Sequence, residues 1–310
     1  MVTNVNDSKT FTDFPDIKKY IGVGTVNILS VNPNNAVLKK YGWSIPDGAK
    51  EPEYTSIDSN GKKNARVRFL VSVDELTEKP VLAVDFWVRN EYRTSDSNGE
   101  LRCQVIDDYG RTAYVNKAQF SKKEIPQWSN GPAKIDKNYK MCHSGEADLV
   151  QFLRTYLNVT PFEEYNPMTK EFELTKNPGK LTFDNWDLIC NGNVQEIKEM
   201  VALKPDNKMK VAFGVRTTNE NKSYQAFLTS DFFPNDIYLN PSTGEYARVK
   251  NRIENFFKNR QNTNVTLDFE ATPIHEWVVT ATDVKDNAPS APKEEDMPED
   301  IAGMAAIIFG

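Results

Sequence analysis

The chain has 310 residues, enough for one large domain or two small ones, and its 39% hydrophobic and 26% charged residues are typical of a globular protein. No apolar run approaches the roughly 18–20 residues of a membrane helix, the N-terminus lacks a signal-peptide pattern, and three scattered cysteines exclude a disulfide framework, so we expect a cytoplasmic protein. The formal net charge is −6, which argues against a uniformly basic nucleic-acid binder but not against a local basic groove.

The first third of the chain predicts strands. Residues 20–33 alternate as a strand, and residues 34–43 suit a short helix. Residues 64–73 and 81–93 alternate with a period of two. Residues 101–115 predict a hairpin that turns at its Asp-Asp-Tyr-Gly sequence, where Asp and Gly suit the backbone angles. About five strands in some 95 residues are typical of a small barrel or sandwich.

Alternation divides the two central strands into apolar and polar faces. The apolar faces, which we expect in the core, consist of Ala65, Val67, Phe69, Val71 and Val73 in one strand and Leu82, Val84, Phe86, Val88 and Tyr92 in the other. The opposite faces combine charged and aromatic side chains with a few others: Arg66, Arg68, Leu70 and Ser72 in the first strand, and Ala83, Asp85, Trp87, Arg89, Glu91 and Arg93 in the second.

The middle of the chain changes to helical spacing, over residues 145–159 and about 194–202. Residues 116–207 therefore predict a partly helical insertion. Later segments predict strands again, at residues 208–217, 223–233, 264–272 and 275–284, with an apolar stripe at helical spacing over residues 244–260.

Metal-binding signals are weak. Four side chains could together supply zinc ligands: Cys103, Cys142, His143 and Cys190. No C-x2-C pair exists, so ordinary residues are the better interpretation, and whether the four converge on a metal stays open.

Catalytic signals are equally weak. The acid pairs Asp107/Asp108 and Asp184/Asp187 could hold a metal in a nuclease, but paired acids are commonly solvated turn residues. No P-loop, zinc-protease or hydrolase motif occurs. We therefore expect no enzyme and no cofactor.

The polar strand faces point to nucleic acid instead. Proteins bind single strands with basic side chains that meet phosphates and exposed aromatic rings that stack on bases. The candidate DNA-binding residues combine both kinds: Arg66, Arg68, Trp87, Arg89, Arg93, Arg111, Tyr114, Trp128 and Arg216. The alternative is a second packing layer over Trp87, with the arginines as ordinary solvated surface.

The C-terminus predicts a disordered acidic tail with an apolar tip over residues 285–310. Residues 283–310 hold seven carboxylates and two lysines, a net of −5, so residues 1–282 carry only −1. The tail residues expected to bind are Glu294, Glu295, Asp296, Glu299, Asp300, Ile307, Ile308 and Phe309. Such a polyanion could compete with DNA for a basic groove and offer its tip to partner proteins. A solubilising terminus and a helix that swaps onto a neighbour are the alternatives.

Four stretches resemble a known family: GVGTVNILSVNPNNAVLKKYGW, QVIDDYGRTAYV, IPQWSNGPAKIDKNYKMCHSGEADLVQFLRTYLN and VAFGVRTT. They are similar to single-stranded DNA-binding proteins of crAss-like tailed phages and cover much of residues 20–217. The resemblance implies an OB-like barrel followed by a disordered acidic C-terminus, in the host cytoplasm. The tail differs from bacterial single-strand-binding tails, because ten residues separate its last acid from the terminus and Gly310 follows Phe309.

The predicted fold is mainly β with a helical insertion (α+β). Residues 1–284 form an OB-like single-strand-binding domain, with a five-stranded barrel and extra strands over residues 20–115 and 208–284, and residues 285–310 form the tail.

The predicted function is sequence-independent coating of single-stranded DNA in phage replication, recombination or repair. Expected partners are DNA, replication or recombination proteins bound by the tail, and further copies of the chain on DNA. The rival hypotheses are a phage structural or assembly protein and a metal-dependent nuclease.

Overall fold

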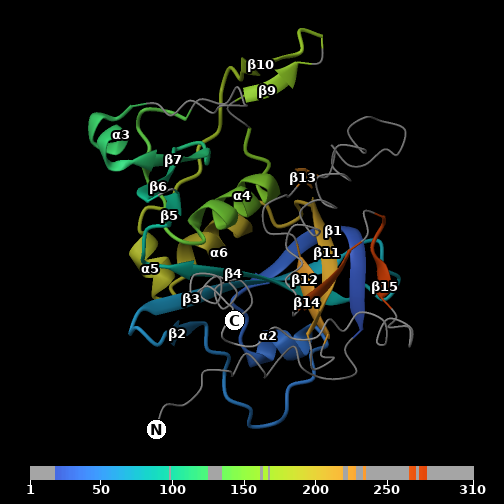
Figure 1. Ribbon diagram of the computed structural model, residues 1–310. Coiled ribbons are helices and arrows are strands. Elements are labelled where there is room, and N and C mark those ends of the chain that lie inside the picture. Colours follow the sequence, from blue (N-terminus) through green and yellow to red (C-terminus); the bar gives the residue numbers. More distant parts are fainter. Residues whose placement is uncertain are drawn as a thin grey trace. The chain divides into compact units, whose positions relative to one another are not determined.

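The structure is a computed structural model that describes residues 18–97, 99–124, 135–160, 163–166, 168–218, 223–227, 233–234, 265–269 and 272–277 (Figure 1). Within these ranges strands outnumber helices, and the strands form open antiparallel sheets. The mainly β fold class with a few helices is therefore confirmed. The chain divides into two compact units: a larger one, Gly24–Ala212 with Leu228–Ala247, and a smaller one, Met1–Val23 with Phe213–Phe227 and Arg248–Gly310.

The larger unit is built on β3 (Lys63–Val73), the first of the two alternating segments. One edge of β3 pairs with β4 (Val81–Arg89), in a register that places Val67 opposite Phe86. The other edge pairs with β2 (Thr55–Ile57) and with residues 26–31 of β1 (Lys19–Val31). β-branched and aromatic residues at every second position favour this pleated, half-buried arrangement.

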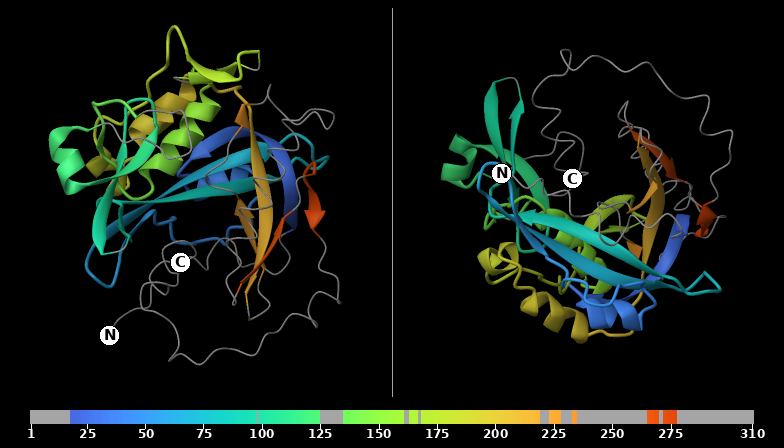
Figure 2. Two further views of the ribbon diagram at one scale, coloured as in Figure 1. Left: turned by 45° about the horizontal axis from the view of Figure 1, so that its top comes forward. Right: turned by 90° about the horizontal axis from the view of Figure 1, so that it is seen from below.

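Helix α4 (Glu146–Tyr156) covers the apolar face of β3 and β4 (Figures 1 and 2). The ring of Phe152 lies with its centroid 4.7 Å from that of Phe69 and 5.0 Å from that of Phe86. Burial of each such ring stabilises the fold by about 1.5–3 kcal/mol. The predicted helix and the predicted apolar faces are thus confirmed as far as Val88, which is fully buried.

A second sheet of the larger unit contains β5 (Thr94–Ser97), β6 (Glu100–Ile106), β7 (Thr112–Asn116) and β8 (Lys140–Met141). β6 and β7 form the predicted hairpin. In its turn, the Asp107 carboxylate accepts hydrogen bonds from the backbone N–H groups of Tyr109 and Arg111, at 3.0 and 2.9 Å. Gly110 adopts a φ of +77°, which favours glycine. Side chains around Ile135 and Tyr139 form the small core of this sheet.

The other described elements of the larger unit are short. They are α2 (Asn35–Lys40), α3 (Lys117–Lys122), β9 (Glu163–Asn166), β10 (Glu171–Leu174), α5 (Trp186–Cys190), α6 (Gln195–Ala202) and β13 (Phe233–Pro234). α2 and α6 confirm the helices predicted at residues 34–43 and about 194–202. The segment predicted as a partly helical insertion contains α3 to α6 together with β8, β9 and β10.

The smaller unit contains the ends of two long strands. Residues 213–218 of β11 (Met209–Thr218) pair with β12 (Ser223–Phe227) and with β14 (Val265–Phe269). Residues 19–21 of β1 pair with β15 (His275–Trp277). A Cβ on Gly22, whose φ is +112°, would lie 2.7 Å from the carbonyl oxygen of Thr272, so only glycine fits there.

Several predictions concern residues outside the described ranges, among them the helical stripe at residues 244–260, Trp128 and the tail at residues 285–310. In the part of the chain that the structure describes, no helix is both long enough and apolar enough to cross a membrane.

Candidate nucleic-acid interface

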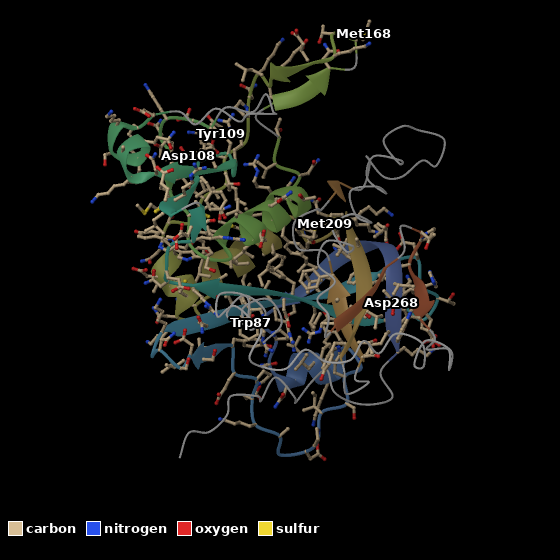
Figure 3. All side chains as sticks on the ribbon, viewed as in Figure 1. Trp87, Asp108, Tyr109, Met168, Met209 and Asp268 are labelled. Atoms are coloured by element: carbon tan, nitrogen blue, oxygen red, sulfur yellow. The ribbon has the colours of Figure 1, made fainter. Side chains whose placement is uncertain are left out.

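The polar sides of β3 and β4 form one surface, called here the cationic face: Arg66, Arg68, Asp85, Trp87 and Arg89. Arg66 lies opposite Trp87, and Arg68 lies opposite Asp85. Opposite residues on neighbouring strands have Cβ atoms about 4.5–5.5 Å apart, so their side chains meet. Because side chains alternate along a strand, this face lies opposite the one that packs against α4; Figure 3 labels Trp87, which belongs to it. The structure confirms that these side chains share one face, but Arg66 and Arg68 are buried there, whereas the sequence pattern predicted an exposed face.

Arg68 forms a buried two-point ion pair with Asp85. Its Nε and one Nη donate to the two carboxylate oxygens of Asp85 at 2.7 and 2.6 Å. The side chain of Arg68 is 3% exposed and that of Asp85 is 23% exposed. Burial alone would raise the pKa of Asp85, but the charge and hydrogen bonds of Arg68 outweigh it and lower that pKa. Arg68 is therefore not an exposed arginine, and its guanidinium is engaged by Asp85.

Among the described residues, no carboxylate forms an ion pair with Arg66. The guanidinium carbon of Arg66 lies 5.4 Å from the ring centroid of Tyr54 and 5.6 Å from that of Trp87, within range of cation–π attraction. The residue is only 9% exposed, and among the described residues its Nε has no hydrogen-bond partner. Burial, followed by repulsion from Arg68, lowers the pKa of Arg66, although an arginine stays protonated. Leaving such a donor unpaired costs about 1–3 kcal/mol, which a bound anion would recover.

Two further predicted arginines follow at and beyond the end of β4. Arg89 is 20% exposed, and its contact with the Glu91 carboxylate is long, at 3.5 Å. Arg93 is exposed, and its backbone N–H donates to the carbonyl oxygen of Cys142 at 2.9 Å. Basic residues thus occur both at the end of β4 and in the segment that follows it.

Tyr92 is the aromatic residue that the sequence pattern misplaced. It was predicted on the apolar face, but β4 ends at Arg89 and Tyr92 is 53% exposed. Its ring lies on the ring of His143, with centroids 4.5 Å apart, and His143 in turn stacks at 5.9 Å on Trp186. The carboxylate of Glu146 accepts from the backbone N–H of His143 at 2.9 Å. This support holds an exposed ring in place, as a base-stacking platform requires.

The remaining predicted residues are not part of the cationic face. Arg111 and Tyr114 belong to the second sheet, where Arg111 donates to the buried Asp107 at 2.7 Å and Tyr114 is 38% exposed. Arg216 belongs to the smaller unit and lies 5.0 Å from the ring centroid of Tyr224. Trp128 and all the predicted tail residues lie outside the described residues.

Neither the zinc candidates nor the first acid pair forms a metal centre in the described ranges, where no group of three or more His, Cys, Asp or Glu side chains is suitably placed. Burial raises the pKa of both Cys142 and Cys190 to about 12, which keeps the thiols neutral. Asp107 is hydrogen-bonded to its own turn and to Arg111, and Asp108 lies 3.3 Å from Lys180. These two carboxylates thus have structural partners.

Comparison with protein-family models, with curated proteins and with solved structures gave no match for this chain. Its function is therefore inferred from the residues and geometry of the cationic face and its surroundings.

Replacing Asp85 with Asn should lower the free energy of unfolding by about 3–5 kcal/mol at neutral pH, because it leaves Arg68 charged and buried without its partner. The lowered pKa of Asp85 means that its contribution is present at neutral pH and is lost as the pH falls below the ordinary Asp value of 3.8. Urea unfolding of both proteins between neutral pH and pH 3 measures this, and the difference should shrink toward the acid end. Equal stabilities at neutral pH would contradict the assigned ion pair.

Proposed function

We propose that this chain is a single-stranded DNA-binding protein that coats DNA without reading its sequence, in phage replication, recombination or repair. The observation that carries the proposal is the guanidinium of Arg66, held between the rings of Tyr54 and Trp87 while the nearby Asp85 is bonded to Arg68. The resemblance of four sequence stretches supports the same function, and with it an OB-like barrel.

The guanidinium groups of Arg66, Arg89 and Arg93 bind phosphates of the single-stranded DNA. Arginine suits this role, because its planar group donates two parallel hydrogen bonds to phosphate oxygens. Arg68 acts indirectly: by occupying Asp85, it keeps that carboxylate from neutralising Arg66. Arg111, Tyr114, Trp128 and Arg216 stay predicted DNA contacts that lie outside the cationic face as it is described.

Bases stack on Trp87 and Tyr92. Trp87 is partly exposed on β4, and Tyr92 presents a ring that is supported from behind by His143. Stacking is worth roughly 1–3 kcal/mol per base and tolerates any sequence, because every base offers a π-face. A protein that coats DNA of any sequence must bind it without recognising the edges of particular bases, and stacking allows this.

The acidic tail competes with DNA for the cationic face and recruits replication or recombination proteins. Residues 283–310 carry a net charge of −5, compared with −1 for residues 1–282, so this end of the chain is a local polyanion. A tethered competitor has a high effective concentration, and DNA displaces it when enough phosphates are present. Displacement frees the tail's apolar tip for partner proteins.

Poly-dT should bind the full chain with an affinity that falls as salt rises, with a log–log slope of about −2 for three phosphate contacts at roughly −0.7 each. Removal of residues 285–310 should tighten binding at low salt and leave it nearly unchanged at high salt, because salt screens the competing charges. Fluorescence titration of labelled poly-dT against both proteins measures these effects.

The rival hypotheses predict other results, in that titration or in a separate incubation of labelled DNA with Mg²⁺. No binding at low salt by either protein favours a structural or assembly protein and contradicts the proposal. Unchanged or weaker affinity after tail removal contradicts the competing tail alone. Cleavage of labelled DNA in the presence of Mg²⁺ would favour the nuclease.

Replacing Trp87 or Tyr92 with Ala should each weaken poly-dT binding by roughly 1–3 kcal/mol, since each removes a stacking ring. Leu203→Ala is the matched control, because Leu203 is 77% exposed and lies after α6. Circular dichroism confirms that the variants are folded. If both aromatic variants are folded and bind like the Leu203 variant, the stacking assignment is wrong.

A further inference from the structure

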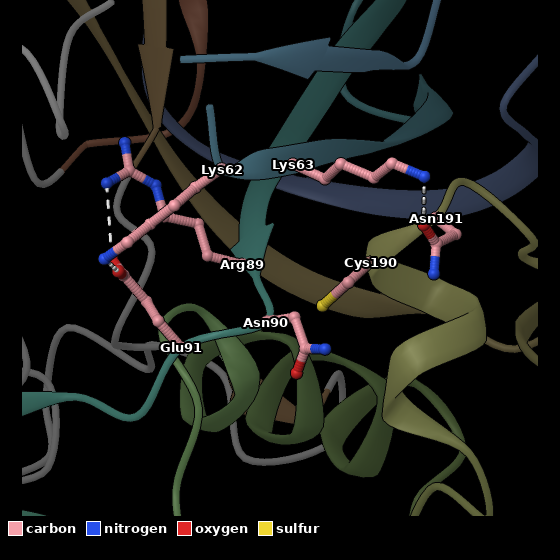
Figure 4. Close-up of a pocket in the computed structure, with 7 residues that line it drawn as sticks. All are labelled: Lys62, Lys63, Arg89, Asn90, Glu91, Cys190 and Asn191. Atoms are coloured by element: carbon pink, nitrogen blue, oxygen red, sulfur yellow. Dashed lines mark hydrogen bonds and ion pairs between the residues drawn. The ribbon is translucent and has the colours of Figure 1, made fainter. Parts of the chain in front are cut away.

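A pocket of about 230 Å³ opens in the larger unit where β3 begins and β4 ends (Figure 4). It is lined by Lys62 and Lys63 next to and within β3, Arg89, Asn90 and Glu91 at the end of β4, and Cys190 and Asn191 at the end of α5. Arg89 also belongs to the cationic face, so the pocket continues that face at its end.

The lining of the pocket is cationic. Three of its side chains are positive and one is negative, which leaves a net charge of +2. Glu91 is shared, because its two oxygens face Lys62 and Arg89, the latter at 3.5 Å. Lys63 donates instead to the neutral amide oxygen of Asn191, at 3.1 Å. One carboxylate therefore serves two cations, and the third is held by an amide that carries no charge.

Within the lining of the pocket, one carboxylate accompanies three cations, and outside it Asp58 also interacts with Lys62. The hydrogen bond from Lys62 is the main cause that lowers the pKa of Glu91, which stays ionised but remains the single anion of the lining. The Cys190 thiol is buried and neutral, as described above. Asn90 is exposed beside the pocket, and its side-chain amide can donate a further hydrogen bond.

We propose that this pocket binds a phosphate group, held by the ammonium groups of Lys62 and Lys63, the guanidinium of Arg89 and the amide of Asn90. A phosphate offers several acceptor oxygens with up to two negative charges, which suits cationic donors at the start of β3 and the end of β4. Figure 4 shows Lys62 directed to Glu91 and Lys63 directed to Asn191, so these flexible side chains turn from those partners to hold the ligand. The weak 3.5 Å contact leaves Arg89 able to turn from Glu91 to the ligand.

The phosphate has two conceivable sources, which share this chemistry. One is the backbone of bound DNA, in which case the pocket is a subsite of the proposed interface and the inference rests on the proposed function. The other is a free phosphate or nucleotide, which the pocket would bind whether or not the chain coats DNA.

Calorimetric titration of the full chain with inorganic phosphate tests the site. The phosphate replaces chloride in the buffer, so that the ionic strength stays constant. Saturable binding is expected. Lys63→Gln and Lys62→Gln should each weaken it by about tenfold, the order of magnitude for a hydrogen bond between charged groups. Lys198→Gln is the matched control, because Lys198 is exposed on α6 and does not line the pocket.

The same variants are then titrated with thymidine monophosphate and with a dT oligonucleotide. Weaker binding of the oligonucleotide by the Lys63 variant identifies the DNA backbone as the source, whereas an effect confined to the small ligands identifies a free phosphate. No saturable phosphate binding, or equal binding by the Lys62, Lys63 and Lys198 variants, overturns the inference.

The two proposals can fail separately. If poly-dT binds but phosphate does not, only the pocket assignment falls. If phosphate binds in a manner that depends on Lys63 but poly-dT does not bind, the proposed function falls and the pocket remains a free-phosphate site.

Discussion

The two-point ion pair between Arg68 and Asp85 is the constraint on which the cationic face depends. A buried ion pair contributes little net stability, because desolvation of both charges offsets most of their attraction. The main effect of the ion pair is on the surroundings of Arg66. Both oxygens of Asp85 are occupied by Arg68, so Arg66 is left between two rings with its positive charge uncompensated by a direct partner in the described region. An anion that binds from outside the protein would compensate the charge of Arg66.

The two faces of β3 and β4 differ: one packs in the core, and the other is the face that we propose to bind DNA. On one side of β3 and β4, Phe69 and Phe86 pack against Phe152 of α4 and supply core energy. On the other side, Arg66 and Trp87 meet across the strands without an apolar layer from α4. Alternation with a period of two makes this division possible, because neighbouring residues of one strand point to opposite faces. The packed core thereby fixes the positions of the groups that we propose to bind DNA.

Sequence reasoning predicted the features that depend on local pattern. Alternation placed Arg66 and Trp87 on one face, and the Asp-Asp-Tyr-Gly turn predicted the β6–β7 hairpin. Features that depend on contacts between distant segments were not predictable. The register that brings Arg68 to Asp85 and the ring of His143 beneath Tyr92 are both of this kind, since their partners lie 17 or more residues apart in the chain. Tyr92 was misplaced because the alternating pattern continues past the residue at which β4 ends.

The Nε–Hε signal of Arg66 tests the central claim most directly. In a nitrogen-15 labelled protein, this signal reports hydrogen bonding at the one donor of Arg66 that is buried without a partner among the described residues. Addition of a dT oligonucleotide should shift the signal, and Arg66→Lys should weaken the binding, because an ammonium cannot reproduce the planar two-point contact. An unmoved Arg66 signal in a protein that binds the oligonucleotide would contradict the account.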